Sequence, residues 1–148
     1  MYNVPIIRLT VVRDPGFCTK TQRILAPSDA ASVLQQYLAG ADREHLVVLL
    51  LDNKNKVVGI HTAGIGVLDS AVYHPREIFK AAIKTNSAGI IIGHNHPSTD
   101  CTPSKDDIIM TERMIGAGKI LGIPVIDSLI VSDGPYLSLK EDGRLDFD

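Results

Sequence analysis

Two aliphatic runs set the strongest limit on what this chain can fold into. The first is Leu46–Leu51, and the second is the β-branched segment Ile90–Ile92, which has a glycine on each side. Apolar runs this short are typical of strands, and an unbroken run is typical of a strand that is buried on both faces. We therefore expect residues 44–52 and 88–92 to be buried strands.

The other segments alternate irregularly between helix and strand patterns. Apolar residues at helical spacing, with a cap or proline at the start, predict helices from Ser28 to Gly40, from Pro75 to Asn86, and from Ser104 to Gly122. Further strands are expected at residues 4–12, 56–62, 125–131 and 136–139. This order predicts an α+β fold with three layers, α/β/α, around one mixed sheet.

The pattern divides the chain into an N-terminal segment, residues 1–26, and one domain, residues 27–148. In the first segment, the strand at residues 4–12 is broken by Asp14-Pro15-Gly16, and an irregular stretch follows. The first segment is thus expected to be a strand followed by a stretch, residues 17–27, that lies on the domain or reaches a neighbouring subunit in a homodimer. A partly mobile leader fits the same sequence equally well.

Composition excludes several classes of protein. No run approaches 18 apolar residues, so neither a membrane span nor a secretory signal is expected. Two cysteines imply no disulfide framework, which favours the cytoplasm. A net charge of −2 argues against direct binding of nucleic acid.

A cluster of metal-ligand residues follows the second aliphatic run. His94 and His96 are two positions apart, so in an extended chain their side chains lie on the same side, roughly 6.6 Å apart. Asp107 falls in the first turn of a helix that Ser104 caps, where the helix dipole favours a carboxylate. Three such ligands leave one position open to water, which is typical of catalytic zinc. The sequence predicts one Zn²⁺ per chain at this place.

The same residues allow a purely structural interpretation. Ser104 and Asp107 have the spacing of a capping box, and single histidines on strands are often only packed. The combination of His94, His96 and Pro97 with this serine and aspartate favours the metal site.

The combined pattern resembles the JAMM motif of the JAB/MPN metalloprotease fold, a cytidine-deaminase-like arrangement. The flanking segments 94–98, 102–104 and 74–82 resemble the bacterial RadC branch of that family. The resemblance extends from about Pro27 to Leu145. Longer RadC-type proteins carry an N-terminal helix-hairpin-helix module, and nothing in this chain resembles it.

The resemblance implies a zinc-dependent metallopeptidase or isopeptidase, a hydrolase that uses metal-activated water on a peptide or protein substrate. Glu44, just ahead of an aliphatic strand, matches the family's proton-transferring glutamate, and Ser104 matches its oxyanion donor. Cys101 could instead fill the fourth zinc position and block the site. The competing hypothesis is a non-catalytic binding module of the same fold, associated with DNA repair or mobile-element functions.

Overall fold

One mixed sheet organises the fold, which a computed structural model describes for residues 1–66 and 73–148. Its strands are β1 (His45–Leu51), β2 (Val57–Ile65), β3 (Gly89–Asn95), β4 (Val125–Val131) and β5 (Tyr136–Ser138). The order across the sheet is β2-β1-β3-β4-β5. Strands β3 and β4 are parallel, and the other neighbours are antiparallel. The predicted α+β class and mixed sheet are confirmed.

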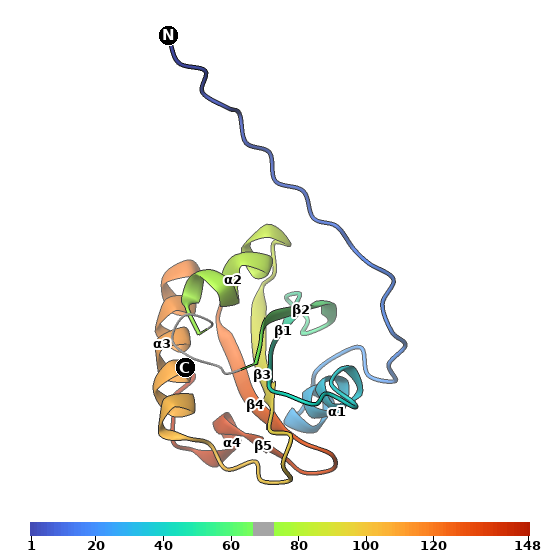
Figure 1. Cartoon of the computed structure of the whole chain (residues 1–148). Coiled ribbons are helices and arrows are strands. Elements are labelled where there is room, and N and C mark those ends of the chain that lie inside the picture. Colours follow the sequence, from blue (N-terminus) through green and yellow to red (C-terminus); the bar gives the residue numbers. More distant parts are fainter. Residues whose placement is uncertain (67–72) are drawn as a thin grey trace.

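Helices cover the sheet on both faces (Figure 1). They are α1 (Pro27–Tyr37), α2 (Pro75–Lys84), α3 (Lys105–Leu121) and the short α4 (Leu139–Asp142). Alternate residues of β1 enter different cores: Leu46, Val48 and Leu50 pack with α2 and α3, whereas Val47, Leu49 and Leu51 pack with α1. As expected, the aliphatic run is unbroken because both faces of β1 are buried, each against its own helical layer.

One helix prediction needs correction, and one helix was not predicted. Helix α1 begins at Pro27 and ends at Tyr37, whereas Ser28 and Gly40 were the expected limits. The Asp29 carboxylate accepts the Ala26 N–H at 3.0 Å. This hydrogen bond, together with Pro27 in the first turn, starts the helix earlier. Helix α4 was not predicted, because four residues show no helical period. Among the described helices, none has the length and apolar content that crossing a membrane requires.

The sequence predicts a strand at residues 4–12, but these residues form no strand within the described chain. These residues run extended away from the sheet and pair with no strand of the described chain (Figure 1). Phe17 and Cys18 contact Tyr37 and Gln36 near the end of α1, and Arg23 forms a bridge with Lys56, beside the start of β2. A strand pattern needs a neighbouring strand to bind its backbone groups, and this segment has none within the described chain.

Candidate metal centre

Strand β3 carries the two histidines to the end of the sheet. Side chains alternate along a strand, so His94 follows Ile90 and Ile92 onto the face that α2 and α3 cover. His94 is only 1% exposed. His96 lies just past the strand, where its N–H donates to the Val131 carbonyl of β4 at 2.9 Å. Both backbone positions are therefore held by neighbouring strands.

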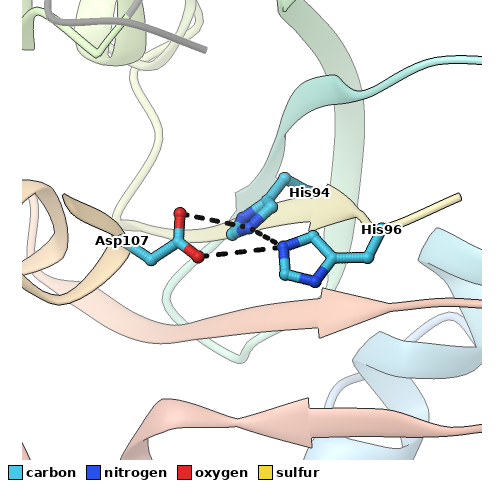
Figure 2. Close-up of side chains that lie close together, drawn as sticks. All are labelled: His94, His96 and Asp107. Carbon is cyan, nitrogen blue, oxygen red and sulfur yellow. Dashed lines mark hydrogen bonds and ion pairs between the residues drawn. The ribbon is translucent and has the colours of Figure 1, made fainter. Parts of the chain in front are cut away.

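Helix α3 brings the carboxylate to the same place. The Asp107 N–H donates to Ser104 Oγ at 3.0 Å, and Asp107 Oδ2 accepts the Ser104 N–H at 2.9 Å. The predicted capping box is thus present. It does not compete with the metal-ligand arrangement, because the same carboxylate also faces the histidines (Figure 2).

The three side chains have the spacing that one tetrahedral metal ion requires. His94 Nε2 lies 3.2 Å from His96 Nε2. Asp107 Oδ1 lies 3.5 Å from His94 Nε2, and Asp107 Oδ2 lies 3.7 Å from His96 Nε2. Ligands at about 2.0–2.1 Å from a tetrahedral zinc ion are about 3.3 Å apart. The donor atoms therefore fit a metal ion, and the cluster could hold one.

Contacts behind the histidines direct their Nε2 atoms toward this point. His96 Nδ1 lies 2.8 Å from the Asp100 carbonyl, which can only accept, so Nδ1 carries the proton and Nε2 is free to bind a metal. His94 Nδ1 lies 3.3 Å from the hydroxyl of Tyr73, a residue that is 2% exposed. Burial, together with the negative charges of Asp107 and Glu44, raises the pKa of Tyr73, so its hydroxyl stays protonated. Such outer contacts orient metal-binding histidines.

Asp107 is ionised in this environment. Burial alone raises its pKa, but the hydrogen bond and charge of His94 and the bonds from Ser104 outweigh burial and lower the pKa to about 2. A carboxylate beside two imidazoles at the end of a sheet is a suitable ligand set for a divalent cation.

Glu44 lies at the rim of the centre. Its Oε1 is 4.0 Å from His96 Nε2, outside the ligand triangle, and its side chain is 38% exposed. The backbone around it is clamped by Asn95: Oδ1 accepts the His45 N–H at 2.7 Å, and Nδ2 donates to the Arg43 carbonyl at 3.0 Å. The Gly66 N–H adds a bond to the Glu44 carbonyl at 2.8 Å.

Sequence reasoning missed Tyr73 and assigned no role to Asn95. Asn95 had a signal, because a residue between two same-side histidines must point to the opposite face of the strand. Cys101 does not occupy the ligand cluster: its thiol lies 3.5 Å from Ser132 Oγ and from the Pro135 carbonyl. His74 caps α2: its Nδ1 accepts the Arg76 N–H at the start of that helix.

Comparison with known proteins gives a consistent result. Residues 24–144 match the family model of the RadC-like JAB domain. Among curated proteins, the chain is 45% identical over 125 residues to a UPF0758 protein of Caldanaerobacter subterraneus, covering 84% of this chain and 54% of that protein. It is 50% identical over 123 residues to one from Clostridium kluyveri, with coverage of 83% and 54%. A UPF0758 protein of Rubrobacter xylanophilus is 44% identical over 138 residues, or 93% and 59% of the two chains. The chain spans little more than half the length of these relatives.

Proposed function

The chain belongs to the family of RadC-like JAB domains, and we propose that it is a zinc-dependent metallopeptidase or isopeptidase. One observation carries the proposal. The Nε2 atoms of His94 and His96 and the carboxylate of Asp107 are 3.2–3.7 Å apart, with a second carboxylate, Glu44, just outside this triangle. A metal shell with an adjacent free carboxylate is a combination that can hydrolyse an amide by activating a water molecule.

We assign the metal to zinc from its donor set. Two imidazoles and one carboxylate are ligands that zinc accepts, whereas magnesium and calcium prefer oxygen ligands throughout. Bound at His94, His96 and Asp107, zinc would supply an activated water nucleophile and polarise the scissile carbonyl.

The side chains around the ligands have separate roles in this proposal. Glu44 takes a proton from the attacking water and passes it to the leaving amine. Ser104 Oγ uses a lone pair to accept the Asp107 N–H, so its hydroxyl proton is free to donate to the developing oxyanion. Tyr73 and Asn95 act through their neighbours, as positioning residues for His94 and for the backbone around Glu44.

The substrate in this proposal is a peptide or protein. A cavity of about 150 Å³ adjoins the centre, and its lining includes Asn95, His96 and Ser132. The cavity shares only His96 with the proposed ligands and catalytic residues, and a space of this size next to His96 could hold one small side chain of an extended peptide. The chain's net charge of −2 makes nucleic acid a poor alternative substrate.

The test combines metal content with hydrolysis. Zinc per chain is measured by mass spectrometry of the elements for the parent protein, His96→Ala and Glu44→Gln, all purified without chelator. We expect about one zinc in the parent and in Glu44→Gln, and little in His96→Ala. A peptide library is then digested with each protein, and products are identified by mass. Cleavage by Glu44→Gln should fall by about 10²–10⁴-fold, because the proton acceptor is lost.

Two results would contradict the proposal. Undiminished cleavage by Glu44→Gln would remove the assigned proton transfer. If the parent protein binds no zinc even when zinc is supplied, Ser104 and Asp107 serve only as a helix cap. A parent that binds zinc and cleaves no peptide would favour the non-catalytic binding module.

A further inference from the structure

The N-terminal arm, residues 4–12, is a strand-like segment that lacks a sheet. Five of its aliphatic side chains are at least 70% exposed: Val4, Ile6, Ile7, Leu9 and Val12. Side chains of this kind are normally buried, and the arm runs extended away from the domain (Figure 1). Exposed aliphatic residues in such number mark a segment that packs against something else.

Strand β2, in turn, has one edge that is largely unpaired within the described part of the chain. It lies at one edge of the sheet, and β1 is its neighbour on the inner side. On the outer side, Val57 N–H donates to the Gln22 carbonyl and Ile24 N–H donates to the Asn55 carbonyl. Beyond that point, residues 58–65 pair with no other strand within the described part of the chain.

The free edge of β2 lacks the charges and proline that usually protect an edge against strand addition, although its pairing with β1 shifts register at two places. Exposed edges normally carry charged residues or proline, which discourage pairing with another chain. Residues 57–65 (VVGIHTAGI) contain no lysine, arginine, acidic residue or proline, and Val58 and Ile65 are exposed. An unprotected edge of this length is suited to receiving a strand.

The arm of the same chain cannot cover this edge by extending the existing pairing. Arg23 faces Lys56 in an antiparallel bridge, so each step back along the chain advances one step along β2. Residues 14–16 would then face residues 63–65, and residues 4–12 would lie beyond the end of the strand. Pro15 also has no N–H to donate.

We propose that the N-terminal arm of one copy adds as a strand to the outer edge of β2, residues 58–65, in a second copy. Reciprocal exchange gives each copy a partner for its arm and for its edge, which is the arrangement of a two-fold dimer. The free end of this edge lies near the metal centre, since Gly66 N–H binds the Glu44 carbonyl. The dimer nevertheless does not depend on catalysis, and its test uses neither metal nor substrate.

The first test is the oligomeric state of the full chain, measured by sedimentation equilibrium over a range of concentrations. We expect a dimer, and we expect Ile7→Asp/Leu9→Asp to weaken it by at least about 100-fold, because two apolar contacts are replaced by charges. The matched control, Ile7→Val/Leu9→Val, should remain dimeric. Thermal unfolding of each variant checks that the domain is intact. A parent that is monomeric throughout, or a dimer that the aspartates leave unchanged, overturns the proposal.

The second test locates the arm. In a Cys18→Ser/Cys101→Ser background, a chain with Leu9→Cys is mixed with a chain of different mass carrying His61→Cys. A short bismaleimide should join the two different chains. Crosslinks only between two Leu9→Cys chains would mean that arms pair with each other, and would overturn the assignment to β2. A crosslink within one chain that carries both substitutions would overturn exchange between copies.

Discussion

Single side chains at the metal centre serve two contacts at once. Asp107 closes the helix cap with Ser104 and also faces both histidines. Asn95 ends strand β3 and also holds the backbone on both sides of Glu44. The capping interpretation and the metal interpretation of the same sequence are therefore compatible, because a carboxylate has two oxygens and several lone pairs.

Asn95→Ala tests whether the clamp positions Glu44. Loss of the Asn95 amide leaves the His45 N–H and the Arg43 carbonyl without their side-chain partner, and Glu44 is then free to shift. We expect the rate of peptide cleavage to fall by about 10²-fold, as for a displacement near 1 Å, while zinc content stays near one per chain. Stability should fall by about 1–3 kcal/mol if the freed groups stay buried.

The control is the double variant Asn95→Ala/Glu44→Gln. If Asn95 acts through Glu44, the double variant should cleave no more slowly than Glu44→Gln alone. If the losses in cleavage rate of the two single variants multiply in the double variant, Asn95 contributes independently of Glu44.

Among the secondary elements, α3 has to lie close to the sheet for Asp107 to reach the histidines. Near its C-terminal end, a Cβ on Gly118 would lie 2.6 Å from the Ile123 carbonyl oxygen, whereas a Cβ on Gly116 would meet nothing within 4 Å. The backbone after α3 therefore lies close to the helix at Gly118 but not at Gly116. Ile109 and Ile120 of α3 are exposed, so the buried face of this helix is narrower than its apolar residues suggest.

These two glycines provide a matched pair of substitutions. Gly118→Ala should destabilise the protein by about 1–3 kcal/mol, because the backbone of Ile123 cannot yield as a flexible side chain would. Gly116→Ala should stabilise it by about 0.5–1 kcal/mol, because alanine favours the helix and the site is open. Urea unfolding measures both changes. Shifts of the same sign in the two variants would disprove the packing argument.

For the whole molecule, the metal centre joins separate layers. The candidate ligands come from β3, from the residue just past it and from α3, and Glu44 directly precedes β1. A metal ion bound there would connect the sheet to the helical layer, and it would bind the folded state alone because the unfolded chain lacks this arrangement.

Zinc should therefore raise the thermal stability of protein that has first been treated with a chelator. At free zinc about 100 times its dissociation constant, the gain is about 2.7 kcal/mol, or roughly 5–10 °C in Tm for a chain of this size. His96→Ala should lose the shift, and magnesium should not replace zinc. Differential scanning calorimetry measures Tm. An equal shift in His96→Ala would place the stabilising zinc elsewhere.

Much of the fold followed from local patterns. The runs at Leu46–Leu51 and Ile90–Ile92 are strands, β4 has its expected bounds, β2 extends to Ile65 beyond its expected end at residue 62, and Ser104 caps α3. These features depend on side-chain period, turn residues and capping, which act over a few residues. For the same reason, His94, His96 and Asp107 could be selected as a ligand set from their spacing on adjacent elements.

The sequence by itself determined the five strands of the sheet, the helix cap and the three candidate ligands, because each is specified by neighbouring residues. Only the tertiary structure decided that Tyr73 contacts His94, that Asn95 holds the start of β1, and that Cys101 turns toward Ser132. It also decided that the aliphatic arm forms no strand with its own domain. Each of these depends on segments that are distant along the chain, and no local period encodes which of them will meet.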